Sequence, residues 1–158
     1  MSEALVARWL AFALPAGLLA GAYISQYVFG LFPCEMCWWQ RYPHFVALLF
    51  AALAFFAPPA RMWAALAGVG LMTSGVIGAF HAGVEYGWWQ GITACAKIDG
   101  SINVLDPSAA PLQRCDTAPW DLFGISLAGF NFLFSSMGAI AIWALLALPQ
   151  AKPILARG

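Results

Sequence analysis

Charged side chains are scarce in this sequence of 158 residues. Lysine, arginine, aspartate and glutamate together make up 9% of the chain, whereas a soluble domain has about 25%. Hydrophobic residues make up 63%, and a water-soluble fold of this length could not bury so much apolar surface. The net charge is zero and only seven side chains are basic, which argues against a nucleic-acid partner because such a partner requires a basic face. The composition therefore predicts a protein whose solvent is the lipid bilayer.

The sequence also lacks the alternation of apolar and polar residues that the strands of a membrane barrel need. It has instead four long apolar stretches, each near or above the ~20 residues with which a helix crosses the hydrocarbon core. Helices satisfy their own backbone hydrogen bonds in lipid, so they are the expected spanning form. No internal repeat or second domain is visible. We predict an all-α membrane protein, a single domain over residues 1–158 that forms a four-transmembrane-helix bundle, with helices at about 9–32, 38–57, 62–82 and 122–148.

The first apolar stretch shares features with a cleavable signal peptide. Arg8 precedes the apolar run, and Ala20-Gly21-Ala22 is a triplet of small residues like those at cleavage sites. The apolar run nevertheless continues past this triplet to Phe32, which a signal peptide does not require. We therefore expect this stretch to be the first transmembrane helix.

The connections between the predicted helices differ in length and charge. Pro58-Pro59 predicts a tight turn, whereas residues 83–121 form a long outer loop between helices 3 and 4 that holds five of the seven acids. Lys and Arg in short connections favour the cytoplasmic side. Four of them lie with the termini and the tight turn, and two lie in the long loop. We expect both termini in the cytoplasm and the long loop on the opposite side.

All four cysteines, Cys34, Cys37, Cys95 and Cys115, lie near predicted helix ends or in the long loop. Disulfides are possible there if that side faces an oxidising compartment. Cys95 and Cys115 suit a structural bridge, since closing a long loop typically stabilises a protein by ~2–4 kcal/mol. A bridge between Cys34 and Cys37 would restrict the unfolded chain very little, and this spacing is common in redox-active pairs. We therefore interpret Cys34 and Cys37 as a redox pair, with bracing disulfides as the alternative.

The stretch "FPCEMCWWQR" at residues 32–41 places this pair at the start of the second helix. The helix dipole favours a thiolate at this position. Arg41 follows Cys37 by four residues, so we expect its positive charge on the same helix face, one turn deeper. An arginine near a helix end can also extend to the lipid headgroups, but ionisable groups at membrane depth tend to be functional. Glu35, within the pair, would disfavour a thiolate.

Two histidines, an acid and a possible metal site complete the candidates. We expect His44 to be structural, whereas His81 is either an interfacial histidine or a site residue, and Glu85 lies one turn beyond it. Four thiols could bind zinc, but zinc modules usually have two closely spaced pairs, and Cys95 and Cys115 are far apart in sequence. We therefore expect no metal.

In their order along the chain, these features resemble the DsbB family of bacterial inner-membrane disulfide bond formation proteins. The resemblance is carried by "PCEMCWWQR", by His81 before the long loop, and by "RCDTAPWDLFGISLAGFN" at residues 114–131, and it covers nearly the whole chain. It implies a protein-disulfide:quinone oxidoreductase of the inner membrane with periplasmic cysteines. Its expected partners are a DsbA-like periplasmic thiol oxidoreductase of thioredoxin fold and the membrane quinone pool, ubiquinone or menaquinone.

The resemblance also implies a relay of disulfides. The reduced partner attacks a Cys95–Cys115 disulfide at Cys95, and Cys115 then attacks Cys34, which frees Cys37 as a thiolate that meets the quinone. Such exchange needs a thiolate attacker and a good leaving thiolate.

By the same resemblance, Arg41 and His81 match residues of the quinone site. A cation beside Cys37 would help this thiolate to leave and would polarise a quinone oxygen. Two features depart from the family pattern, namely Glu35 within the pair and a somewhat short segment between the loop cysteines.

The sequence leaves two alternatives open. A vitamin K epoxide reductase-like enzyme also couples thiols to a quinone in a helical bundle, but its closely spaced pair normally comes late in the chain. A non-catalytic membrane protein with bracing disulfides is the other alternative, and it predicts that loss of Cys34 affects stability alone.

Overall fold

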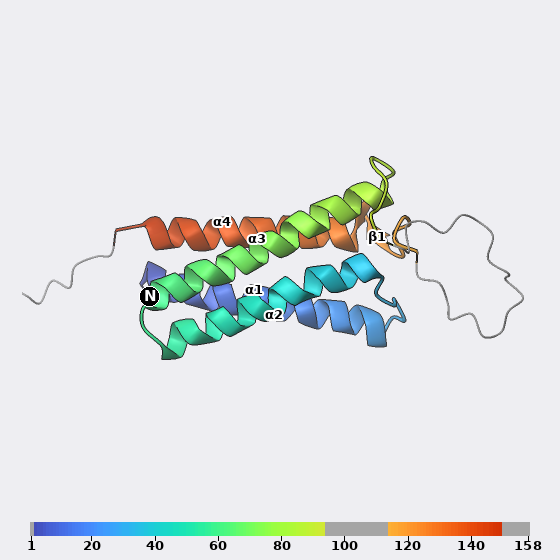
Figure 1. Ribbon diagram of the computed structural model, residues 1–158. Coiled ribbons are helices and arrows are strands. Elements are labelled where there is room, and N and C mark those ends of the chain that lie inside the picture. The colour runs from blue at the N-terminus through green and yellow to red at the C-terminus, as the bar shows by residue number, and fades with distance from the viewer. Residues whose placement is uncertain (1, 94–113, 150–158) are drawn as a thin grey trace, which may run out of the picture.

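The computed structural model of the protein describes residues 2–93 and 114–149. Cys95 and most of the predicted outer loop lie outside the described residues. Four helices lie side by side and run alternately in opposite directions (Figure 1). Their bounds are α1 Glu3–Tyr27, α2 Glu35–Phe56, α3 Ala60–Glu85 and α4 Leu127–Ala147. The prediction of a helical protein with four helices is confirmed.

A small hairpin before α4 is the one departure from an all-helical architecture in the described part of the chain. Strands β1 (Asp121–Leu122) and β2 (Ile125–Ser126) pair antiparallel, with Asp121 opposite Ser126. Phe123 and Gly124 form the turn, both with positive φ, at 53° and 76°. The hairpin delays the start of α4 to Leu127, where the sequence predicts helix from residue 122.

The helix ends at the hairpin side of the bundle also differ from the expected positions. α1 ends at Tyr27 rather than at residue 32, and Gly30 in the connection has a positive φ of 70°. α2 begins at Glu35 rather than at residue 38, because the sulfur of Cys34 accepts a hydrogen bond from the backbone N–H of Cys37 and caps the helix. α3 continues to Glu85 rather than ending at residue 82.

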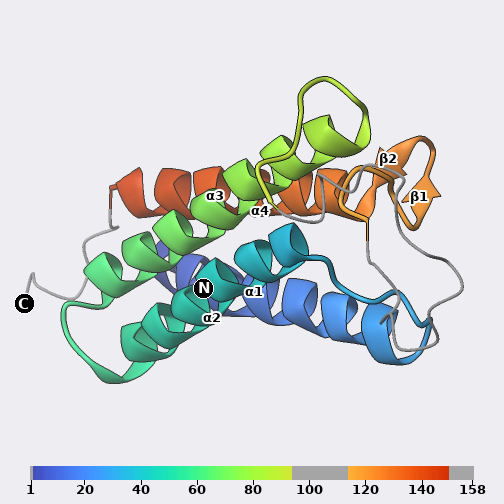
Figure 2. The same ribbon diagram turned by 45° about the vertical axis from the view of Figure 1, so that its right-hand side comes forward.

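α3 is the central element of the bundle, since it packs against α2 on one side and against α4 on the other (Figures 1 and 2). The first turn of α2, the last turn of α3 and the hairpin lie together at one end. The start of α1 and the α2–α3 turn lie at the opposite end. The core between the helices is built largely from alanine, including Ala11, Ala47 and Ala139, so that the backbones approach closely.

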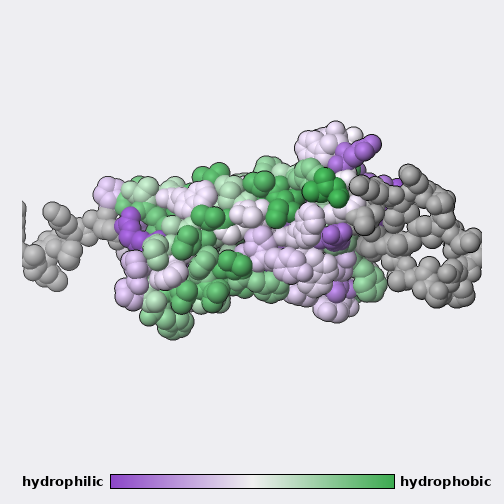
Figure 3. Space-filling view, in the orientation of Figure 1, coloured by the Kyte–Doolittle hydropathy of each residue, from purple (hydrophilic) through white to green (hydrophobic). Residues whose placement is uncertain are grey.

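Three of the described helices, α1, α3 and α4, are long and apolar enough to cross a membrane. α2 has 22 residues but buries Gln40, Arg41 and His44 in its first half, which lowers its apolar character. The space-filling view shows hydrophobic side chains along the bundle and the most hydrophilic ones toward its two ends (Figure 3). These features are those of a multi-pass membrane protein.

Two glycines of α3 permit its close packing. A Cβ on Gly70 would lie 2.9 Å from the backbone oxygen of Pro43 in α2, and a Cβ on Gly78 would lie 2.9 Å from the backbone oxygen of Ala128 in α4. Both contacts are with backbone atoms, which cannot rotate away. α3 therefore needs glycine at both positions.

We predict that Gly70→Ala and Gly78→Ala each destabilise the protein by about 1–3 kcal/mol, the usual cost of overpacking. The matched control is Gly21→Ala in α1, where a Cβ would meet no atom within 4 Å. This control should be neutral or stabilising, since alanine favours a helix over glycine by about 1 kcal/mol. Unfolding in detergent micelles, followed by circular dichroism, measures all three variants. Equal stability of Gly78→Ala and Gly21→Ala would contradict the packing argument.

Candidate functional site

Cys34 and Cys37 face each other at the start of α2. Both are free thiols, and their sulfur atoms are 2.9 Å apart. The Cys34 sulfur also accepts a hydrogen bond of 3.3 Å from the backbone N–H of Cys37. Cys34 is buried, whereas Cys37 is half-buried. The hydrogen bond with Cys37, together with burial, raises the pKa of the Cys34 thiol well above its ordinary value of 9.0. Of the two thiols, Cys34 is therefore the weaker acid.

Glu35, the acid between the two cysteines, lies at the surface of the described structure. It is exposed and occupies the first turn of α2. A negative charge at this position interacts favourably with the positive end of the helix dipole. Glu35 therefore stabilises the start of the helix on which the two thiols lie.

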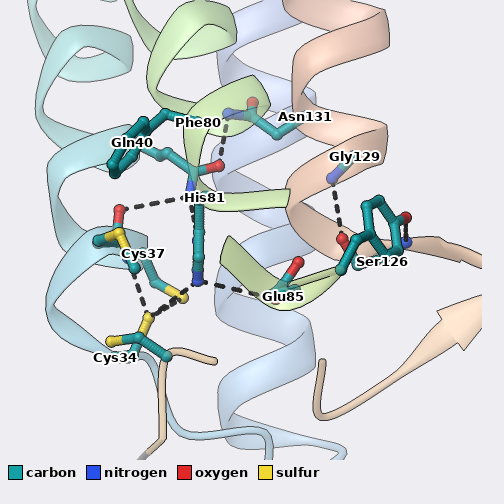
Figure 4. Close-up of polar contacts among 12 residues, drawn as sticks. Cys34, Cys37, Gln40, Phe80, His81, Glu85, Ser126, Gly129 and Asn131 are labelled. Carbon is teal, nitrogen blue, oxygen red and sulfur yellow. Dashed lines mark hydrogen bonds and ion pairs between the residues drawn. The ribbon is translucent and has the colours of Figure 1, made fainter. Parts of the chain in front are cut away.

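His81 of α3 connects the thiols to the interior of the bundle (Figure 4). Its Nε2 atom is 3.6 Å from the sulfur of Cys34 and 3.7 Å from Oε1 of Glu85, and its Nδ1 atom is 2.8 Å from Nε2 of Gln40. His81 also hydrogen-bonds to the backbone of Cys115. Only 2% of its surface is exposed. The sequence left two positions open for His81, and the structure places it beside the thiol pair.

Arg41 lies in α2 but binds α1. Its guanidinium donates to Oε1 of Gln26 at 2.7 Å and to the backbone oxygen of Ala22 at 3.2 Å. It also lies 4.8 Å from the ring centres of both Tyr23 and Trp38. Among the described residues it has no carboxylate partner and no hydrogen bond to Cys37. Its buried positive charge is therefore held by neutral groups.

A cavity of about 430 Å³ opens beside Cys37, and all four helices contribute to its wall. Apolar side chains such as Leu18, Phe32 and Phe134 form much of the lining. The groups in the wall that can form hydrogen bonds or carry charge include Cys37, Gln40, Arg41, His44, His81 and Glu85. Such a mixture, an apolar chamber with a few convergent polar groups, is typical of a site for a small organic ligand.

A buried polar cluster continues from His81 into the bundle. Asn131 of α4 donates from Nδ2 to Oε1 of Gln40 at 2.8 Å, and its Oδ1 atom accepts from Oγ of Ser135 at 2.9 Å. Ser74 of α3 lies 2.9 Å from Nε2 of His44. Sequence reasoning missed Gln40, Ser74 and Asn131. The available signal was an isolated amide in an otherwise apolar helix, which is costly unless it has a partner.

Cys115 lies at the same end of the bundle, fully buried in a cluster with Cys34, Met36 and Val84. It is in a disulfide bond. Cys95, the partner that the sequence resemblance implies, lies outside the described residues. The structure thus brings a thiol pair and a disulfide cysteine into one apolar cluster.

The thiols and the histidine also form a group that could hold a metal ion. The ligand atoms of Cys34, Cys37 and His81 all lie within 4.8 Å of one another. Sulfur and imidazole nitrogen are ligands that zinc accepts. The same three groups, reduced and hydrogen-bonded, equally form a redox site.

Comparisons with known proteins agree on one family. The family model described as Disulfide bond formation protein DsbB matches residues 5–146. Disulfide bond formation protein B of Marinobacter nauticus is 32% identical over 149 residues, which cover 84% of this chain and 88% of that protein. Disulfide bond formation protein B of Verminephrobacter eiseniae is 30% identical over 139 residues, which cover 82% of this chain and 78% of that protein. No solved structure matches the chain.

We predict that Cys37 of the reduced protein reacts with iodoacetamide at least about tenfold faster than Cys34 at mildly alkaline pH, because the thiolate is the nucleophile. Cys34 is buried and its raised pKa keeps it protonated, whereas Cys37 lines the cavity. Mass spectrometry of the alkylated peptides measures both rates. In denaturant the two rates should become similar. Equal rates in the folded protein would contradict the conclusion that Cys34 is the weaker acid of the two thiols.

Proposed function

The chain belongs to the DsbB family of disulfide bond formation proteins, and on this premise we propose that it passes two electrons from a reduced periplasmic dithiol protein to a membrane quinone. Family membership makes it a membrane protein of disulfide bond formation. Beyond family membership, we propose the partner, the quinone and the roles of the individual site residues.

The observation that carries the proposal is the cavity beside Cys37. Its volume of about 430 Å³ lies within the ~300–1,000 Å³ range of small-molecule sites. It joins an accessible thiol to an apolar chamber at the level of the helices, where a lipid-soluble oxidant would reach it. Gly17 and Gly21 line the same cavity along α1, and both face open space that would accommodate part of an apolar ligand.

Arg41 would hold a quinone oxygen. The arginine is buried at 6% exposure, lines the cavity and has only neutral partners among the described residues. Its charge is therefore free to stabilise negative charge that develops on a carbonyl oxygen. His81, on the same wall, would provide a second polar contact.

The proposed reaction balances between the cysteine pair and one quinone. The thiols of Cys34 and Cys37 lose two electrons and two protons as they form a disulfide, and the quinone takes up both to become a quinol. Cys37 is the sulfur that would face the quinone, because it lines the cavity and lies 2.9 Å from the sulfur of Cys34. For the disulfide to form, the proton on Cys34 would have to leave, and the electron pair displaced as the S–S bond forms would have to pass to the quinone.

The first half of the relay would pass through Cys115. It is buried in the same cluster as Cys34, so exchange between the two needs only a local movement. The reduced partner, a DsbA-like protein of thioredoxin fold, would first attack at Cys95. The partner would then be left with a disulfide, and its two electrons would pass toward Cys37.

We place the end with the cysteines on the periplasmic side of a bacterial inner membrane, with both chain termini in the cytoplasm. In this arrangement α2 is the fourth membrane span. Its 22 residues would extend about 33 Å as a helix, enough for the hydrocarbon core. Its buried polar residues face other helices rather than lipid, which supports this assignment.

We predict that the purified protein reduces ubiquinone when it is supplied with a reduced thioredoxin-fold dithiol protein, and that Cys34→Ser abolishes turnover. The change replaces sulfur by oxygen at the N-cap, where serine is a good capping residue, so Cys34→Ser should fold. Ubiquinone absorbance measures turnover, and thermal unfolding checks the fold. Absence of turnover in the wild type would refute the proposal. Full turnover in folded Cys34→Ser would remove Cys34 from the proposed reaction.

We predict that a variant with Cys37 as the only cysteine gives a visible absorbance band when ubiquinone is added, from contact between the thiolate and the quinone. Arg41→Ala should lose this band and, in the otherwise unchanged protein, slow turnover by about 100-fold, as for loss of one oxyanion donor. The matched control is Arg61→Ala at the opposite end of the bundle, where Arg61 donates to the backbone oxygen of Leu146. A band that survives Arg41→Ala would remove Arg41 from the quinone site.

A further inference from the structure

The buried side-chain amides of Gln40 and Asn131 form a chain of hydrogen bonds that ends at His81. Nε2 of Gln40 is 2.8 Å from Nδ1 of His81, and Oε1 of Gln40 accepts from Nδ2 of Asn131 at 2.8 Å (Figure 4). Gln40 comes from α2, His81 from α3 and Asn131 from α4, so three helices are joined at one level. Gln40 is 7% exposed and His81 is 2% exposed, so water does not replace these bonds.

Backbone carbonyls fix which end of each amide is the nitrogen. Nδ2 of Asn131 donates to the backbone oxygen of Ser74 at 3.1 Å, and Nε2 of Gln40 donates to the backbone oxygen of Met36 at 3.3 Å. A carbonyl oxygen can only accept. Neither amide can therefore be turned over without setting an oxygen against an oxygen.

From this arrangement we propose that Gln40 and Asn131 are positioning residues that hold His81 as the neutral tautomer with its proton on Nε2. Gln40 presents an N–H to Nδ1, so Nδ1 must offer its lone pair and carry no proton. The single proton of the neutral ring then sits on Nε2. That atom faces the sulfur of Cys34 at 3.6 Å and Oε1 of Glu85 at 3.7 Å.

The rest of the polar cluster prevents the side-chain amide of Asn131 from rotating. Oδ1 of Asn131 accepts from Oγ of Ser135 at 2.9 Å and lies 3.0 Å from Nε2 of His44. Ser74 donates its hydroxyl proton to the backbone oxygen of Gln40 at 2.8 Å. The oxygen and the nitrogen of the Asn131 amide therefore both have partners, and rotation of this amide would break hydrogen bonds to several helices at once.

The consequence for chemistry, which rests on the proposed function, is that His81 acts toward Cys34 as a donor and not as a base. A neutral N–H can stabilise the Cys34 thiolate, or an oxygen of a quinone in the cavity, without placing a full positive charge in a buried site. The other tautomer would present a lone pair to the same groups. Gln40 thus determines whether Nε2 of His81 donates or accepts a hydrogen bond.

The tautomer is measured directly by the ¹⁵N chemical shifts of histidine-labelled protein. The chain has only two histidines, and His44→Asn identifies the signals of His81. We expect neutral His81 with a protonated Nε2 and a bare Nδ1. Gln40→Glu replaces the donor by a carboxylate oxygen that can only accept, so Nδ1 should gain a proton. The matched control is Gln90→Glu at an exposed position, which should leave the His81 signals unchanged.

Gln40→Met provides a second variant if the buried carboxylate prevents folding. It removes the donor without adding an acceptor, so His81 should populate both tautomers. A wild-type His81 protonated at Nδ1 would overturn the proposal. So would Gln40→Glu or Gln40→Met variants with unchanged His81 signals.

Turnover tests the chemical consequence separately from the tautomer. At saturating quinone, Gln40→Met should be at least about tenfold slower, similar to the loss seen when a metal-bound histidine loses its orienting partner, while Gln90→Glu should match the wild type. Unchanged turnover with a changed tautomer would overturn the role of the tautomer in the reaction. A wild type that reduces no quinone would refute the proposed function, whereas the ¹⁵N result would still decide the tautomer.

Discussion

The hydrogen bond from Asn131 of α4 to Gln40 of α2 is the interaction on which the rest of the site depends. A buried amide among apolar helices costs several kcal/mol unless its partners are present, so the helices must meet where the amides meet. Gly78 permits this meeting, since a Cβ there would lie 3.0 Å from Nδ2 of Asn131. The polar cluster therefore fixes the relative height of α2, α3 and α4, and with it the level at which His81 meets the thiols.

The start of α2 couples helix formation to thiol chemistry. Cys34 is at once the N-cap of the helix and the buried partner of Cys37, so one sulfur atom receives the N–H of Cys37 and contacts its thiol. The exposed Glu35 then has a structural explanation, because an acid in the first turn stabilises that helix end. The acid that seemed to oppose thiolate formation lies outside the cavity that Cys37 lines.

Sequence reasoning identified the four helices and the closely spaced cysteines, because apolar length and residue spacing are local properties. It placed α4 too early, since a two-residue strand such as β1 has no periodic signal. It also missed Gln40 and Asn131, which are far apart in the sequence. Whether an isolated amide finds a partner depends on the register between helices, and no local pattern records that register.

Arg41 shows that sequence spacing also fails to predict where a charged group lies. Helical spacing correctly puts it one turn below Cys37, but spacing does not fix where a long side chain extends. Its guanidinium lies against α1, held by Gln26 and Ala22, rather than on the sulfur. An arginine paired to the thiolate would be neutralised by it, whereas one held by neutral groups keeps its charge for a ligand. In the proposed reaction this separates two tasks: the helix start and Cys34 support the Cys37 thiolate, while Arg41 acts on the oxidant that the cavity admits.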